Sequence, residues 1–320
     1  MKVIEVARHG GAEELRMVHR PAPALGEGQV RVRTAAIGVN YLDVQERTGA
    51  YQRAVPYVPG DEGSGTIVAV GAGVSGWRLG QRVCWQGIQG SYADEVVVPA
   101  GRLIAVPGDV TDDVAAALLT QGLTAHYLVT DSYRVRAGDL VVVLAGAGGV
   151  GLLLTQAAKL KDARVVSVTS TATKAELCRA AGADRVVTYD DLESTVLAES
   201  AGEGAQVVYD SVGQSTFEKS LSCLRRRGTL VLYGQSSGPV APFDLRRLGQ
   251  LGSLTVTRPT LRDFVVGETQ LRARAAELID WAQKGLVTPR IGGSYPLAEA
   301  ARAHADLEAR RTSGKLLLIP

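Results

Sequence analysis

The most regular pattern in this chain is an alternation of short apolar runs with helical segments, which begins near residue 138. Residues 140–144 read Leu-Val-Val-Val-Leu, and glycines and a helical segment up to residue 159 follow them. Later apolar runs lie at residues 164–169, 185–188, 206–209, 230–233 and 254–257, with a second helical segment at 174–181. Runs that are apolar at every position are typical of parallel strands covered by helices on both faces. Six of them predict an α/β fold with a Rossmann doubly wound parallel sheet.

The segments on either side of this region follow other patterns. Before it lie β-prone runs separated by Gly and Pro clusters, at residues 30–39, 65–70, 82–85 and 92–98. They predict a compact β-rich domain with few long helices. After about residue 258 we predict amphipathic helices at 271–284 and 297–311 and a last strand at 315–319. One stripe of the second helix carries Leu297, Ala300, His304 and Leu307.

Composition and charge narrow the class of protein. With 320 residues, 46% hydrophobic and 21% charged, the chain is long enough for two folded domains. A net charge of +2 and dispersed basic residues weigh against nucleic-acid binding, and we interpret the densest basic run, Arg225-Arg226-Arg227, as a solvated helix end. No apolar run is long enough for a membrane span, and residues 1–11 do not resemble a signal peptide. Three separated cysteines, Cys84, Cys178 and Cys223, suit reduced thiols, so we predict a cytoplasmic protein.

The glycine-rich sequence at residues 146–151 is the strongest functional signal in the chain. It reads Gly-Ala-Gly-Gly-Val-Gly and stands directly after the first apolar run, where a helix begins. Gly146 permits a tight turn, Gly148 lets the backbone approach a pyrophosphate, and Gly151 lets helix and strand pack closely. The helix N-terminus supplies free N–H groups for phosphates. A plain glycine-rich turn is the alternative, and the position after a strand favours a dinucleotide site.

The end of the second strand indicates which dinucleotide binds. NAD enzymes usually carry Asp or Glu there to bind the ribose 2′-hydroxyl. Here the first carboxylate is Glu176, and Ser170, Thr171 and Lys174 precede it. Lys174 is alternatively an exposed lysine at a helix start. Because the acid is missing as well, the sequence favours NADPH.

Several motifs in series resemble one known family over essentially the whole chain. They lie at residues 38–43 (Gly-Val-Asn-Tyr-Leu-Asp), 58–65, 145–151, 208–213 (Val-Tyr-Asp-Ser-Val-Gly), 234–238 and 316–320. In order and spacing they resemble the zeta-crystallin-like NADPH:quinone oxidoreductases of the medium-chain dehydrogenase/reductase superfamily. The resemblance implies a GroES-like catalytic domain from residues 1–122 and 260–320, a Rossmann domain at 123–259, and a homodimer joined through the Rossmann sheets.

The resemblance also implies roles for individual residues. The candidate catalytic residues are Asn40, which the resemblance places near the nicotinamide, and Tyr51. Tyr51 is not implied by the resemblance: it follows the Asn40 segment at the expected rim of the cleft, and we propose it as a hydrogen-bond donor to a substrate carbonyl. For Tyr51, ordinary packing of a loop aromatic is the alternative. The expected cofactor-binding residues are Tyr41, Asp43, Thr124, Tyr127, Gly146, Gly148, Gly149, Val150, Gly151, Ser170, Thr171, Lys174, Tyr189, Val212, Gly234, Gln235, Ser236, Ser237, Pro259, Thr260, Leu261 and Arg310.

The zinc ligands of the superfamily's alcohol dehydrogenases have no counterpart in this sequence. Where those enzymes carry Cys, His and Cys, this chain has Asp43, Asp61 and a residue near Thr120. Its three cysteines are far apart, and its four histidines show no ligand spacing. We therefore expect no metal. Without a Lewis acid, nothing lowers the pKa of an alcohol hydroxyl. The sequence therefore favours reduction of an electrophilic acceptor over oxidation of an alcohol.

Three functions remain open from the sequence. The first is NADPH-dependent reduction of a small quinone. The second is NADPH-dependent reduction of the double bond of an enone or enal, which would differ in its rates on simple enones and quinones. The third is an NADPH-binding crystallin-like or RNA-binding protein, which an RNA gel shift at physiological salt would reveal.

Overall fold

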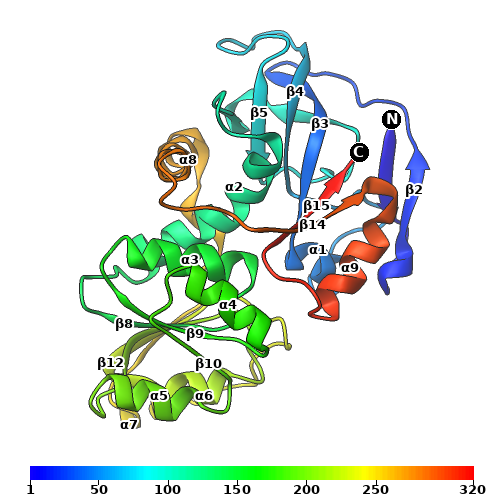
Figure 1. The fold of residues 1–320 in the computed structure, drawn as a ribbon. Coiled ribbons are helices and arrows are strands. Elements are labelled where there is room, and N and C mark those ends of the chain that lie inside the picture. The colour runs from blue at the N-terminus through cyan, green and yellow to red at the C-terminus, as the bar shows by residue number, and fades with distance from the viewer. The chain divides into compact units, whose positions relative to one another are not determined.

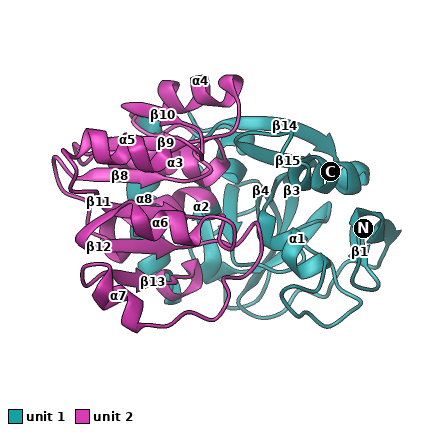
Figure 2. Cartoon of the chain, turned by 90° about the horizontal axis from the view of Figure 1, so that it is seen from below, with its two compact units in different colours: residues 1–120, 265–283, 289–320 teal, residues 121–264, 284–288 magenta.

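The computed structural model describes residues 1–320 (Figure 1), and the chain divides into two compact units (Figure 2). Unit 1 comprises residues 1–120, 265–283 and 289–320, and unit 2 comprises residues 121–264 and 284–288. The sequence placed the boundaries after residues 122 and 259, whereas the units divide after residues 120 and 264. Each unit has its own sheet and its own core.

Unit 2 is built on one sheet of six parallel strands. In space the strands run β10-β9-β8-β11-β12-β13, and every neighbouring pair is parallel. Their bounds are β8 (Leu140–Val143), β9 (Arg164–Val168), β10 (Arg185–Val187), β11 (Ala205–Asp210), β12 (Leu224–Leu232) and β13 (Thr255–Thr257). Numbered along the chain this order is 3-2-1-4-5-6, which confirms the predicted Rossmann sheet.

Helices cover both faces of this sheet. In Figure 1, α3 (Gly149–Lys159) and α4 (Ala172–Ala180) lie on one side of the strands, and α5 (Leu192–Glu199) and α6 (Phe217–Ser222) lie on the other. All four residues of β8 are buried, because a central strand packs against helices on both faces. The remaining helical segments of unit 2 are η3 (Leu128–Ser132), α7 (Arg246–Gln250) and η4 (Leu261–Phe264).

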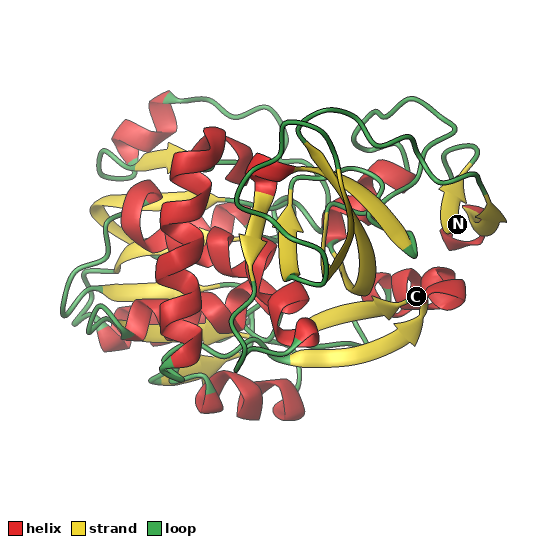
Figure 3. Ribbon diagram, turned by 90° about the horizontal axis from the view of Figure 1, so that it is seen from above, coloured by secondary structure: helices red, strands yellow, loops and turns green.

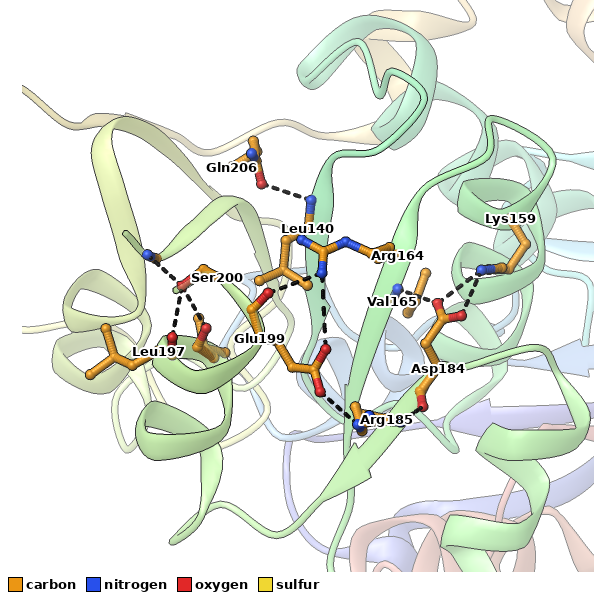
Figure 4. Close-up of polar contacts among 12 residues, drawn as sticks. Leu140, Lys159, Arg164, Val165, Asp184, Arg185, Leu197, Glu199, Ser200 and Gln206 are labelled. Atoms are coloured by element: carbon orange, nitrogen blue, oxygen red, sulfur yellow. Dashed lines mark hydrogen bonds and ion pairs between the residues drawn. The ribbon is translucent and has the colours of Figure 1, made fainter. Parts of the chain in front are cut away.

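Polar side chains hold together the edge of this sheet where the strands begin (Figure 4). Lys159 donates to Asp184 at 2.8 Å, and this bond lowers the pKa of the Asp184 carboxyl against the opposing effect of its partial burial. Glu199 contacts Arg164 and Arg185, and the Gln206 amide oxygen accepts from Leu140 N at 2.7 Å. This amino edge is therefore occupied by internal contacts, which leaves the carboxyl edge for a ligand.

Unit 1 is β-rich, and long loops join several of its strands (Figure 3). Its main sheet has the order β14-β15-β3-β4-β5-β7, and β6 pairs with the first half of β3. The second half of β3 pairs with β15. Besides the separate hairpin of β1 (Lys2–Val6) and β2 (Leu15–His19), the strands are β3 (Gln29–Val39), β4 (Glu62–Val70), β5 (Arg82–Gln86), β6 (Glu95–Pro99), β7 (Leu103–Ala105), β14 (Ile291–Pro296) and β15 (Lys315–Ile319).

Few helices accompany these strands. They are α1 (Tyr41–Arg47), the first part of α2 (Asp112–Tyr127), α8 (Gly267–Gln283) and α9 (Ala300–Glu308), with single turns at η1 (Ala12–Glu14), η2 (Ala100–Arg102) and η5 (Leu297–Glu299). The predicted stripe is confirmed, since Leu297, Ala300 and His304 are buried and the half-buried Leu307 packs against the same core cluster. No helix of the protein combines the length and the hydropathy that crossing a membrane requires.

One helix was missed, and two expectations about local structure were wrong. Residues 112–127 form the 16-residue helix α2, which the sequence did not predict. Arg225, Arg226 and Arg227 belong to strand β12 and not to a helix end, because α6 already stops at Ser222. The strand expected from residue 92 begins at Glu95, and Tyr92 precedes it as a buried side chain.

Candidate functional site

The cofactor-binding residues predicted in the sheet region of unit 2 gather at the carboxyl edge of its sheet. The glycine loop follows β8, Ser170 to Lys174 follow β9, and Tyr189 follows β10. Val212 follows β11, residues 234–237 follow β12, and residues 259–261 follow β13. Because all six strands are parallel, these loops emerge at one edge, where open α/β sheets bind their ligands.

The glycine loop is shaped by backbone contacts that side chains would disrupt. Ala145 has a positive φ of 50°, and Gly148 N donates to Ala145 O at 2.9 Å to close the turn. A Cβ on Gly151 would lie 2.6 Å from Ala145 O and 2.7 Å from Gly146 O, so this position must be glycine for α3 to pack here. Gly148, the N-cap of α3, offers no side chain to the helix N-terminus. The N–H groups of the first turn therefore remain available to an anion.

A buried acceptor without a partner lies beside this loop. Gln121 is 9% exposed, and its Oε1 makes no hydrogen bond. Its amide lies against the helix start, since a Cβ on Gly149 would stand 1.9 Å from Oε1. Buried polar atoms are normally satisfied by protein, water or ligand. An orphaned acceptor next to free N–H groups fits a ligand that carries both hydroxyl and phosphate groups, as a dinucleotide does.

The end of β9 carries two hydroxyl groups and an ammonium group close together in the chain. Thr171 is the N-cap of α4, and its hydroxyl oxygen accepts from Lys174 N at 3.3 Å. Ser170 and Thr171 are exposed and Lys174 is half-buried. A phosphate at this helix start would meet the N-terminal end of the α4 dipole, two hydroxyls and the lysine.

Asp210 organises the loops that follow β11 and β12. This carboxylate is fully buried at the end of β11 and accepts four hydrogen bonds. The donors are Val212 N at 2.7 Å, Gly213 N at 3.0 Å, Thr216 Oγ1 at 2.7 Å and Ser220 Oγ at 2.8 Å. The two loops are further joined where Ser236 N donates to Ser211 O and Ser237 N to Val212 O. These bonds hold Val212 and residues 234–237 next to each other. Both predicted segments can therefore line one binding site at the carboxyl edge.

The remaining predicted residues of unit 2 lie on α2 and after β13. Thr124 is half-buried, whereas Tyr127 is 2% exposed and stacks on Phe264 with ring centroids 4.2 Å apart. Burial raises the pKa of the Tyr127 phenol. After β13, Pro259 is buried, and Thr260 Oγ1 donates to Asp263 at 3.1 Å as η4 begins.

In unit 1, Asn40 is held by a buried ion pair that the sequence did not reveal. Asn40 Nδ2 donates to Glu62 Oε1 at 2.7 Å, and Lys315 Nζ donates to Asn40 Oδ1 at 2.8 Å. Lys315 also pairs directly with Glu62, and neither side chain has any exposed surface. Glu62 Oε2 accepts from Thr120 N at 2.9 Å. Asn40 itself is 9% exposed.

A second buried chain of hydrogen bonds begins at Asp43. Its carboxylate accepts from Asn40 N at 2.8 Å and from Tyr92 Oη at 3.0 Å, and Tyr92 Oη lies 3.0 Å from His304 Nε2. Since Tyr92 gives its one proton to Asp43, His304 donates to Tyr92 through Nε2. Burial raises the pKa of Asp43 to about 7 and lowers that of His304 to about 3. Asp43 is buried and accepts the N–H of Asn40 at the start of α1. Its contact with a cofactor stays a prediction.

The other candidates of unit 1 lie at its surface. Tyr51 follows α1 and is 36% exposed, and its backbone N–H donates to Gln45 O at 3.0 Å. Tyr41 is half-buried, and its pKa is raised by burial and by the nearby Glu308 carboxylate. Arg310 is exposed just after α9 with a positive φ of 55°.

The positions that correspond to zinc ligands hold groups with other partners. Asp43 caps α1, Asp61 accepts from Gln86 Nε2 at 3.0 Å, and Thr120 N binds Glu62. Burial, followed by the charge of Glu62, raises the pKa of Asp61 to about 6. No group of three or more His, Cys, Asp or Glu side chains could hold a metal ion. All three cysteines are free and buried, as the sequence predicted.

Two family models match most of the chain. The model described as an alcohol dehydrogenase GroES-like domain matches residues 26–108. The one described as a zinc-binding dehydrogenase matches residues 149–284. The zinc in that description has no ligand set here, for the reasons just given.

Individual proteins match over most or all of their length. The chain is 39% identical to a quinone oxidoreductase of Pseudomonas aeruginosa, over 100% of this chain and 99% of that protein. It is 38% identical to a 2-haloacrylate reductase of a Burkholderia species, over 92% of each. Among solved structures, the Escherichia coli quinone oxidoreductase complexed with NADPH superposes with a TM-score of 0.97 at 36% identity, covering 100% of both chains.

Proposed function

Because the chain belongs to the quinone oxidoreductase family of the medium-chain dehydrogenase/reductase superfamily, we propose that it reduces quinones with NADPH and without zinc. The observation that carries the proposal is the carboxyl edge of the unit 2 sheet. There a glycine loop opens α3, and Ser170, Thr171 and Lys174 stand where an acid would select NAD. The same edge binds dinucleotides in Rossmann folds generally.

The residues of this chain would bind and orient the reactants. The first-turn N–H groups of α3 bind the pyrophosphate, and the hydroxyls and lysine at the start of α4 bind the 2′-phosphate. Gln121 Oε1 accepts from a hydroxyl of the cofactor. Asn40 orients the nicotinamide end, and Tyr51 donates a hydrogen bond to the oxygen of the acceptor. When bound, NADPH supplies the hydride, so the protein contributes orientation and exclusion of water.

A second candidate is the reduction of an activated carbon–carbon double bond. The 38% identity to a 2-haloacrylate reductase favours it, and an enone would use the same residues. NADPH oxidation rates measured on a panel of quinones and enones test both candidates. Higher kcat/KM on quinones supports the first, higher values on enones support the second, and no oxidation of NADPH with any acceptor contradicts both.

A homodimer in the cytoplasm is part of the same proposal. Strand β13 ends the six-stranded sheet, so one side of it is unpaired within the chain and can pair with a second copy. The three free, buried cysteines support a reducing compartment for this protein.

NADPH is expected to bind at least about tenfold more tightly than NADH. The reason is the hydroxyl and ammonium groups at the start of α4, which would pair with the 2′-phosphate. Lys174→Ala should weaken NADPH about tenfold and leave NADH nearly unchanged, as fluorescence titration would measure. Lys161→Ala, at the opposite edge of the sheet after α3, is the control and should change neither constant. Equal dissociation constants for the two cofactors in the wild type would contradict the prediction.

Exhaustive chelation is expected to leave the activity unchanged. The positions of Asp43, Asp61 and Thr120 offer no ligand set, and each group is bound to internal partners. Metal analysis of the purified protein should find substoichiometric zinc. About one zinc per chain, with activity lost on its removal, would refute the zinc-independent mechanism.

Replacement of Tyr51 by phenylalanine is expected to lower kcat for a quinone by less than about tenfold. The side chain is 36% exposed, so water can also protonate the reduced oxygen. An obligatory general acid would cost about 10²–10⁴-fold. If Tyr51→Phe abolished turnover while NADPH still bound normally, the tyrosine would be an essential acid and the enone reaction would gain support.

A further inference from the structure

We propose that Glu62 and Lys315 are positioning residues that fix the side-chain amide of Asn40 in one orientation toward the nicotinamide. The inference rests on the proposed function. It adds to the proposed site two buried residues to which the sequence analysis assigned no role.

The geometry leaves the amide of Asn40 one arrangement. An amide can usually be turned over with little change in shape, which exchanges its oxygen and nitrogen. Here a lysine ammonium, which can only donate, faces Asn40 Oδ1 at 2.8 Å. The Glu62 carboxylate, which as an anion can only accept, faces Asn40 Nδ2 at 2.7 Å. Turning the amide over would break both bonds. The two bonds therefore fix the direction of the second N–H of Asn40 Nδ2 and of the second lone pair of Asn40 Oδ1, which they do not use.

The backbone of Asn40 is fixed as firmly as its side chain. Asn40 N donates to Asp43 at 2.8 Å, and Asn40 O accepts from Asp43 N at 3.0 Å. Asn40 is therefore bound through all four of its polar atoms before any ligand arrives. Such preorganisation lowers the cost of orienting a bound group.

The surrounding strands are built to admit the ion pair. Lys315 is the first residue of β15, Glu62 is the first of β4, and Asn40 follows β3, which lies between those two strands. A Cβ on Gly38 would stand 2.5 Å from Glu62 Oε1 and 2.6 Å from Lys315 Cε. The glycine thus leaves the space that the pair occupies.

Stability alone is a poor explanation for this pair. Both side chains are completely buried, and removing two charges from water costs about as much as their attraction returns. Apolar residues of the same volume would stabilise the sheet at least as well. Directed hydrogen bonds to Asn40 are what an apolar pair could not provide.

The test compares a whole cofactor with a fragment that lacks the nicotinamide. In the variant Glu62→Gln/Lys315→Met both charges are removed together, so no unpaired charge remains buried. We expect it to bind NADPH about tenfold more weakly than wild type. Adenosine 2′,5′-bisphosphate, which reaches only the α4 end of the site, should bind within about twofold of wild type. Calorimetric titration of the full-length protein measures both constants, and thermal unfolding verifies that the variant is folded.

Two further variants make the result decisive. Arg82→Met breaks another ion pair of unit 1, with Asp112, and should change neither constant. Glu62→Asp keeps both charges but draws the carboxylate back from Asn40 Nδ2. It should weaken NADPH in the same direction by a smaller factor, and it provides the test if the double variant does not fold. Equal weakening of both ligands, or no change in either, would overturn the positioning role. A wild type that binds the bisphosphate but not NADPH would instead overturn the proposed function.

Discussion

Replacing Asp210 by alanine is expected to lower the free energy of unfolding by about 3–5 kcal/mol. The carboxylate is fully buried and accepts four hydrogen bonds, two from backbone N–H groups and two from hydroxyls. Alanine leaves all four donors inside the protein without an acceptor, and each unsatisfied group costs about 1–3 kcal/mol before the loop relaxes. Urea unfolding followed by circular dichroism measures the loss.

Two matched variants separate this effect from general disturbance. Asn in place of Asp210 keeps one oxygen for the backbone N–H groups, and its amide can donate to the hydroxyls of Thr216 and Ser220, which rotate to accept. Asp210→Asn should therefore be less destabilising than Asp210→Ala. Asp190→Ala removes a carboxylate whose side chain is 99% exposed and should change stability by less than about 0.5 kcal/mol. A loss below about 1 kcal/mol for Asp210→Ala would contradict the prediction.

Much of unit 2 is predictable because its strands are buried on both faces. Such strands appear in the sequence as uninterrupted apolar runs, and β8, β9 and β10 lie within one or two residues of the predicted spans. The glycine loop was predictable for a different reason: its strand, turn and helix start follow one another directly in the chain, so the whole motif is visible in the sequence.

Helix α2 escaped prediction because it has almost no polar face. Residues 115–119 are all buried, and Gly122 and Leu123 are buried as well. A helix that is apolar nearly all round lacks the 3.6-residue alternation on which a sequence-based prediction depends.

The helix end predicted at residues 225–227 was wrong because these arginines lie in an irregular part of strand β12. Leu224 pairs with Ala205, but the next pair joins Thr229 to Val207, so β12 has several more residues than β11 over that stretch. Of these arginines, Arg226 and Arg227 are exposed, and Arg227 adopts a positive φ of 60°. The predicted solvation is confirmed for Arg226 and Arg227 but not for the half-buried Arg225, and the predicted helix end was wrong.

The polar network around Asn40 could not be predicted from local pattern. Its members are 22, 253 and 275 residues apart in the chain. They meet only because β3 lies between β4 and β15. A single local signal existed: Lys315 opens an otherwise apolar strand and is 1% exposed, and a buried lysine requires an acidic partner.

The largest effect on cofactor binding is expected from Gly151→Ala, which should raise the dissociation constant of NADPH at least about 100-fold. The added Cβ would meet Ala145 O at 2.6 Å, Gly146 O at 2.7 Å and Gly146 Cα at 2.8 Å, all of them backbone atoms. No side chain can turn aside to relieve these contacts, so the start of α3 must move away from the loop. The N–H groups that would bind the pyrophosphate move with it.

Two other glycine variants calibrate this result in fluorescence titrations with NADPH. Gly249→Ala makes the same substitution in helix α7, where a Cβ meets nothing within 4 Å. It should leave NADPH binding unchanged and, through helix propensity, stabilise the protein by up to about 1 kcal/mol. Gly149→Ala meets only the side chain of Gln121, which can rotate away, so its effect should be smaller than that of Gly151→Ala. If Gly151→Ala bound NADPH as tightly as Gly249→Ala does, the pyrophosphate could not depend on the position of α3, and the glycine loop would be no more than a tight turn.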